Sequence, residues 1–415
     1  MPESYLDYVR KPDDERIRML RDVDPRGHAA RAAAIPEVNA VLQEWLGLYR
    51  SGPFTGVTSD GERRAGLFGR RDESAPSKEA AAAAVAFLDL LSPEQQEVVS
   101  HPINSRVWRA WMNPEIYLQQ YGLRLDECSP EIRLAALELM ASSLSESGFA
   151  KVQQVMRVND ELGRLVLAPQ IMNEFSYNVN VFGDPRADDV WGWQVYGHHL
   201  ALNCFFAGAQ MVLTPVFMGA EPTRLDSTRW DASYSLFAPE ERLALLLVRS
   251  LDAEERERAV LFGKKRDSAM PPDRIHPADE LNLAGAFRDN RVIPYEGISL
   301  TEVSPDKQRL AMAIAREMLD YLPSGPLTHR MRELESHLAD TYFAWIGGTG
   351  DDDPFYFRLQ SPVVILELDH HAGVFLSNEE PKKFHTHTVI RTPNGNDYGA
   401  MLHGPADGPA TLDED

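Results

Sequence analysis

The sequence is poor in cysteine and in positive charge, and it has no long hydrophobic run. Its 415 residues include two cysteines, Cys128 and Cys204, too few for a disulfide framework or a thiolate metal site. The formal net charge is −21. Because nucleic acids and anionic membranes bind basic surfaces, neither is an expected partner. No apolar segment is long enough to cross a bilayer, and the charged N-terminus lacks an apolar signal region, which predicts a cytoplasmic protein.

Several catalytic and nucleotide-binding motifs are also missing. The chain has no GxGxxG after a strand, no P-loop, no CxxC pair and no GxSxG. The GGTG at residues 347–350 lacks the lysine and the following helix that a phosphate loop needs. These absences argue against nucleotide binding and against a serine-nucleophile hydrolase.

The remaining pattern predicts an α+β protein, with helical N-terminal and middle segments packed around a mostly antiparallel sheet. Two β segments far apart in sequence build this sheet. We expect one unit over residues 1–403, helical at 1–170 and 236–345, with a β-hairpin at 175–223 and a β segment at 355–400. Residues 404–415 read as a disordered tail, and residues 264–281, which are polar and proline-rich, as a surface loop.

A weak internal similarity is visible between two helical stretches. Residues 84–102, AVAFLDLLSPEQQEVVSHP, resemble residues 244–262, ALLLVRSLDAEERERAVLF. In both, an apolar helix is followed by a cap residue and a short acidic helix. Any helix–cap–helix pair would look similar, so this pattern alone does not establish a repeat.

The hairpin places two adjacent histidines in an apolar context. Residues 191–223 read as two strands separated by the small-residue break at 207–210. His198 and His199 then fall in the middle of the first strand. Successive strand side chains point to opposite faces, so only one of the two would face a given site.

The second β segment supplies two histidines at a spacing that suits a metal. His385 and His387 are two residues apart, so both imidazoles leave the same strand face. With His198 or His199 they predict a three-histidine site for a divalent metal ion, zinc first, with iron or copper as the alternatives. The other interpretation is that each histidine is a buried polar group bonded to the backbone. His370–His371 at an expected turn and His403 near the end are weaker candidates.

Two acids and two arginines are the candidates for catalysis and substrate binding. Glu367 lies in the apolar strand VVILELD, where it must face solvent, pair with an arginine or support a metal ligand. Glu174, just before the hairpin, is either a general base or a surface acid. Arg391 and Arg358 could each hold a substrate carboxylate or form an ordinary salt bridge.

Aromatic residues precede the paired histidines. By strand alternation, Trp191 and Trp193 share a face with His199, and Tyr196 shares a face with His198. Such residues usually fill a core, but Trp193 and Tyr196 beside a polar cluster would also suit the wall of a small-molecule pocket.

Several long motifs resemble a known family. WGWQVYGHHLALN, VLTPVFMGAEPT, YFAWIGGTG and FHTHTVIRTPNGNDYG are similar to the bacterial and fungal domain-of-unknown-function family 3500. The stretches PFTGVTSDGERRAGLF and WRAWMNPEIYLQQYGLRL extend the resemblance over about residues 30–400. It implies a single family unit and brings no assigned reaction. After NDYG the relatives continue with a charged helical end, from which this chain departs.

Together these features predict a metal-dependent enzyme that hydrolyses an amide, ester or lactone bond in a small anionic molecule. Glu367 or Glu174 would be the base and Arg391 would orient the substrate. The first alternative is an iron- or copper-dependent oxygenase or oxidase that uses the same histidines. The second alternative is a small-molecule binding protein without catalysis. The third is a metal-free hydrolase in which His199 or His387 is the general base. The expected partner is a small-molecule substrate, and a homo-oligomer is compatible with the sequence.

Overall fold

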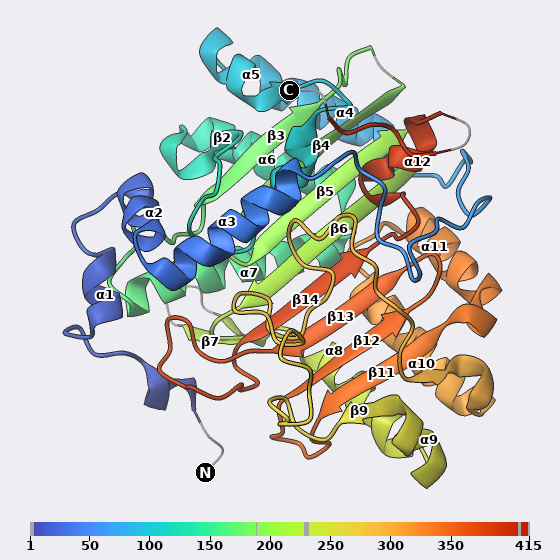
Figure 1. Ribbon diagram of the computed structural model, residues 1–415. Coiled ribbons are helices and arrows are strands. Elements are labelled where there is room, and N and C mark those ends of the chain that lie inside the picture. The colour runs from blue at the N-terminus through green and yellow to red at the C-terminus, as the bar shows by residue number, and fades with distance from the viewer. Residues whose placement is uncertain (1–3, 188, 228–231, 406–407, 414–415) are drawn as a thin grey trace.

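The structure, a computed structural model, describes residues 4–187, 189–227, 232–405 and 408–413. Within them, twelve strands form one sheet at the centre of the molecule, flanked by helices (Figure 1). Along the main path the order is β1-β3-β4-β5-β6-β14-β13-β12-β11-β10, with β2 also paired to β3 and β9 to β11. The expected α+β class is confirmed. The sheet is mixed rather than mostly antiparallel, because β1 joins β3, and β9 joins β11, in parallel.

The sheet is built from two copies of one unit. The first contains α4 (Ser77–Asp89), α5 (Pro93–Val99), β1 (Ser100–His101), β2 (Leu123–Arg124), η3 (Leu125–Glu127), α6 (Pro130–Ser143), α7 (Glu146–Leu165), β3 (Tyr177–Phe182), β4 (Val190–Gly197), β5 (Leu200–Ala207) and β6 (Gln210–Ala220). The second repeats this order as α8 (Ala238–Ser250), α9 (Ala253–Ala259), β9 (Val260–Phe262), β10 (Ile298–Ser299), η4 (Leu300–Glu302), α10 (Pro305–Met318), α11 (Ser324–Ser336), β11 (Tyr342–Gly347), β12 (Phe355–Gln360), β13 (Ile365–His370) and β14 (Thr386–Arg391). The weak similarity seen in the sequence is therefore part of a repeated fold.

The strand registers of the two units also agree. Phe182 pairs with Gly192 in the first unit, and Ile346 pairs with Tyr356, each 164 residues later, in the second. The final strands of the units, β6 and β14, pair antiparallel at the centre of the sheet. The units are thus related by an approximate two-fold axis between β6 and β14.

A matching turn in each unit shows why the sequence repeats locally. GLRLDECSP at 122–130 corresponds to GISLTEVSP at 297–305, and each Ser-Pro opens a helix, α6 or α10. Gly122 and Gly297 both have a φ of +86°. A β-carbon on either would lie within 2.5 Å of a carbonyl oxygen of the neighbouring strand, so the conformation and the space both require glycine.

The two faces of the sheet are covered differently. One face packs on the long helices α4, α6, α7, α8, α10 and α11 through the largest apolar cluster. The other is covered by α2 (Pro25–Ala33), α3 (Pro36–Arg50), η2 (Arg106–Ala110) and the segment 263–297. Figure 1 shows α3 and this segment in front of the strands and α7 and α8 behind them. The predicted surface loop at 264–281 is thus partly wrong, because Lys265 and Asp279 are buried against the sheet.

The remaining elements are short. They are η1 (Tyr5–Tyr8), α1 (Glu15–Leu20), β7 (Arg224–Ser227) paired with β8 (Ala232–Ser235), η5 (Leu338–Asp340), η6 (Asp397–Gly399) and α12 (Ala400–His403). The strand β11 lies in the range expected to be helical. Of the tail, residues 406–407 and 414–415 lie outside the described residues, but Ala410 and Leu412 are buried, which contradicts a disordered end. Among the described residues, none of the helices is both long enough and apolar enough to cross a membrane.

Candidate metal centre

Three histidines from the two units meet where β6 and β14 pair. One nitrogen each of His199, His385 and His387 lies within 4.8 Å of the other two, and the three residues are 4%, 0% and 4% exposed. His199 comes from the turn between β4 and β5, whereas His387 lies in β14 opposite Gly219 of β6. The amide of Gly219 donates to the His199 carbonyl at 2.8 Å, which fixes the turn against the strand pair.

The ring nitrogens of this triad are directed at one another. Nε2 of His385 lies 3.1 Å from Nε2 of His387. Because Nδ1 of His385 donates to the Ala372 carbonyl at 2.6 Å, its proton is on Nδ1 and its Nε2 carries a lone pair. Neither ring nitrogen of His199 forms a hydrogen bond with a described residue. The arrangement offers lone pairs that could hold a metal ion.

Burial keeps these imidazoles neutral. Desolvation lowers the pKa of His385, and it holds the pKa values of His199 and His387 well below their usual range. The neighbouring imidazoles act in the same direction. A neutral imidazole is the form that binds a metal.

The paired histidines lie in a turn rather than in mid-strand. Gly197 pairs with Leu200, and His199 has a φ of +61°, so His198 and His199 form a two-residue hairpin loop. The predicted single strand is therefore two strands, β4 and β5. Strand alternation does not apply to the pair, whose rings stack with centroids 3.9 Å apart.

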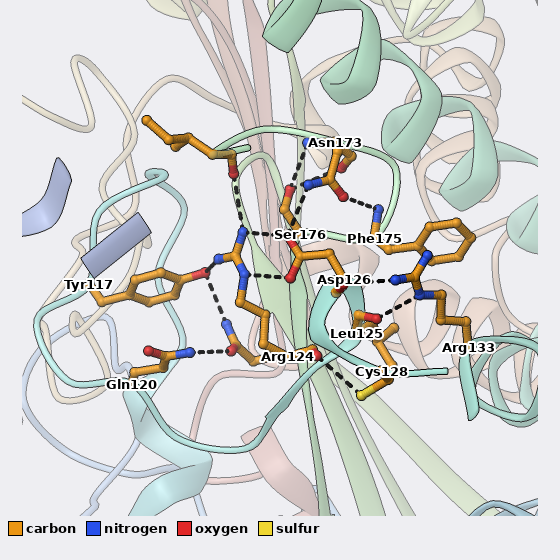
Figure 2. Close-up of polar contacts among 12 residues, drawn as sticks. Tyr117, Gln120, Arg124, Leu125, Asp126, Cys128, Arg133, Asn173, Phe175 and Ser176 are labelled. Atoms are coloured by element: carbon orange, nitrogen blue, oxygen red, sulfur yellow. Dashed lines mark hydrogen bonds and ion pairs between the residues drawn. The ribbon is translucent and has the colours of Figure 1, made fainter. Parts of the chain in front are cut away.

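His198 supports the site from behind His199. Its Nδ1 lies 2.8 Å from Oδ1 of Asn159 in α7, and desolvation lowers its pKa to about 4. Asn159 in turn donates to the Asn173 carbonyl and the Ser176 hydroxyl, both at 2.9 Å. Figure 2 shows the loop carrying Asn173 and Ser176 beside the Arg124 guanidinium and its partner Asp126. His198 is outside the convergent triad.

Asp369 and His371 lie beside the triad; the sequence offered His371 only as a weaker candidate, and Asp369 was not selected. Asp369 pairs with His387 across β13 and β14, and His371 Nε2 lies 3.1 Å from its carboxylate. The ring of His371 is centred 3.9 Å from that of His387. Burial alone would raise the pKa of Asp369, but the Lys265 ammonium and His371 hold it at about 2. The adjacent letters Asp-His-His at 369–371 were the available signal.

The segment 371–385, between β13 and β14, packs beside the site. Buried Glu221 at the end of β6 accepts hydrogen bonds from the amides of Val374, Phe375 and Leu376 at 2.9–3.1 Å. The ring of Phe375 meets His198 edge-on. Glu221 was not selected from the sequence, although an acid in the apolar run MGAEPT was its signal.

Neither predicted base lies in the triad. Glu367 accepts hydrogen bonds from the amides of Leu283 and Ala284 at 2.9 Å and from the Tyr356 hydroxyl at 2.6 Å, so its oxygens anchor the segment 263–297. Glu174 is in the loop before β3, partly exposed and 3.8 Å from Arg157. The expectation of a catalytic base at Glu367 is corrected, and Glu174 has the ion-pair role that was its alternative.

The predicted substrate-binding arginines have structural partners. Arg391 is fully buried, pairs with Asp289 at 2.7 Å and Asp397 at 3.2 Å, and donates to two carbonyls of the segment 263–297. Arg358, also buried, pairs with Glu296 at 2.7 Å. Their ordinary salt-bridge interpretation replaces the expected contact with a substrate carboxylate.

The predicted aromatic wall is divided between the two sheet faces. Trp193 packs in the helix-side cluster and donates to the Ser143 hydroxyl at 3.0 Å. Tyr196 lies on the other face, where its hydroxyl donates to the Tyr121 carbonyl at 2.9 Å. Both are core residues, so they do not form a common wall at the histidines.

The fold and site define a two-unit α+β protein with a buried three-histidine centre that could hold a metal ion. The family described as "Protein of unknown function (DUF3500)" matches residues 73–400, and the chain belongs to that family. Neither the curated proteins nor the solved structures gave a match.

Proposed function

We propose that this protein is a metal-dependent enzyme with a mononuclear centre on His199, His385 and His387. The observation that carries the proposal is the convergence of three buried, neutral imidazoles from two units of the chain. A purely structural role would give each ring its own hydrogen-bond partner. Here Nδ1 of His387 is buried without a partner among the described residues.

The spacing of the His385 and His387 nitrogens fits a shared metal. Two imidazoles bound at about 2.05 Å with a tetrahedral angle have nitrogens about 3.3 Å apart, and octahedral neighbours are about 2.9 Å apart. The observed 3.1 Å between His385 and His387 lies between these values. An all-nitrogen donor set suits zinc, iron or copper, and zinc is our first choice because three protein ligands leave a position for water.

The reaction we propose is hydrolysis of an amide, ester or lactone bond. The metal would lower the pKa of a bound water. His371 replaces Glu367 and Glu174 as our candidate proton acceptor, because its ring lies against that of His387. Asp369, with its low pKa, remains charged, and its carboxylate, 3.1 Å from Nε2 of His371, would orient that ring.

The alternative is an iron or copper centre that activates dioxygen. The same three imidazoles are compatible with this chemistry, because imidazole also binds iron and copper. Metal identity and oxygen uptake separate the two reactions.

Metal analysis tests the proposal. Protein purified without a histidine tag should contain close to one equivalent of metal. The double variant His385→Ala/His387→Ala should lose it, and His329→Ala, a histidine on α11 outside the site, should keep it. Zinc would be followed by hydrolysis assays with ester, amide and lactone probes. If the parent takes up no metal after incubation with zinc, iron and copper, the proposal is wrong.

A further inference from the structure

A second candidate site is a hollow of about 290 Å³ between the C-terminal end of α3 and the turn 287–291. Arg109, Arg288 and Arg291 line it, together with the apolar surfaces of Leu48 and Phe287. None of the described residues lining it is acidic or belongs to the histidine centre. Three guanidinium groups therefore line the hollow, and the carboxylates of Glu44 and Asp289, which pair with two of them, are not part of its lining.

Arg288 and Arg291 have hydrogen-bond donors that no described residue uses. Arg291 donates to the Leu283 carbonyl at 3.1 Å and forms no ion pair with a described carboxylate. Arg288 pairs with Glu44 at 2.8 Å through one terminal nitrogen, whereas its Nε is buried without a hydrogen-bond partner. Arg109, which is buried, pairs with Asp289 at 3.2 Å and with Asp413 at 3.5 Å.

The local field favours an anion. Burial and the adjacent charge of Arg288 hold the pKa of Arg291 below its usual range. A negative group bound between the two guanidinium groups would offset their mutual repulsion. Arginine also presents paired N–H donors in the geometry that carboxylate and phosphate oxygens accept.

The hollow is held in position before any ligand binds. Arg391 donates to the carbonyls of Ala284 at 2.9 Å and Gly285 at 2.7 Å, which ties the turn to the sheet. Asn290 bonds to the backbone of residues 53–55 through both its amide nitrogen and its oxygen, each at 2.8 Å. A rigid site loses less entropy on binding than a flexible one.

We propose that this hollow binds a small, multiply charged oxyanion, recognised through Arg288 and Arg291, with Arg109 also in the lining. The ligand class comprises phosphate groups and di- or tricarboxylates, which share this chemistry. The proposal does not depend on the histidine centre, because the two sites share no residue.

Calorimetric titration with inorganic phosphate and, separately, with citrate tests the proposal. At least one of the two anions should bind saturably at low ionic strength. The anion that binds more tightly shows whether the site prefers a phosphate or a carboxylate ligand. Arg288→Gln and Arg291→Gln should each weaken that binding about tenfold or more, as expected for a lost hydrogen bond to a charged group. Circular dichroism would confirm that both variants are folded.

Two controls make the result specific. Arg309→Gln removes an exposed guanidinium on α10 and should leave the affinity unchanged. His387→Ala should also leave it unchanged, which separates oxyanion binding in the hollow from binding to a metal. The proposal is overturned if neither anion binds saturably, or if both arginine variants bind as tightly as the parent.

Discussion

Gly219 offers a direct steric test of the histidine centre. A β-carbon at this position would lie 2.8 Å from Cδ2 of His387 and 3.0 Å from Cδ2 of His199. Carbon atoms in contact are about 3.5–4.0 Å apart, so each ring would have to move by about 0.5 Å or more. Metal–nitrogen distances tolerate changes of about 0.2 Å. We therefore expect Gly219→Ala to weaken zinc binding at least about tenfold, or about 1.4 kcal/mol.

The same substitution should also destabilise the metal-free fold, by about 1–3 kcal/mol, as other overpacked core positions do. Zinc affinity would be measured by competition with a chromophoric chelator, and stability by urea denaturation of the metal-free protein. Gly47→Ala is the control: its β-carbon meets nothing within 4 Å on exposed α3, so zinc binding should not change. Parental zinc affinity in Gly219→Ala would refute the steric argument.

Three further predictions concern His371, His198 and Arg391. His371→Gln should keep the metal and lower the rate of hydrolysis of an ester probe about 100-fold or more, whereas metal loss would make His371 structural. His198 has a pKa of about 4 when folded and about 6.5 when unfolded, so the unfolded chain binds more protons between these values. Stability should therefore fall by up to about 3 kcal/mol as the pH drops from 6.5 to 4, and urea denaturation of the parent and His198→Gln measures this term. Arg391→Met should cost about 3–5 kcal/mol in urea denaturation, because it leaves buried Asp397 without an ion pair and Asp289 with Arg109 alone; a loss no larger than that of an exposed arginine would contradict this.

The α+β class and the pairing of His385 with His387 could be predicted from the sequence, because both depend on the local spacing of residues. Apolar runs predicted the β segments, and their pairing is seen between β6 and β14. A spacing of two placed His385 and His387 together. The failure at His198 and His199 has a local cause: a non-glycine residue with positive φ turns the chain without the glycine or asparagine that normally marks such a loop.

The roles of the buried charges could not be read from sequence for a different reason. Glu367 and Arg391 were recognisable as charges in apolar strands, but most of their partners are 83 to 107 residues away in the segment 263–297. That segment looks like a surface loop because it is polar and rich in proline. Its polar backbone and acids are matched to charges on the sheet, and this matching appears only in three dimensions.

Comparison of the two units distinguishes residues that the fold requires from residues that are particular to the histidine site. In the second unit, Asp369 pairs with His387. The residue that corresponds to Asp369 in the first unit is Phe205, 164 residues earlier, and it pairs with Val212. Phe205 and Val212 pack in a small apolar cluster. The same sheet position can therefore be filled by apolar side chains, which bury without the desolvation cost of an acid and an imidazole. The fold therefore does not require the polar pair Asp369–His387 of the second unit. This favours a binding or catalytic role for the pair over a structural one.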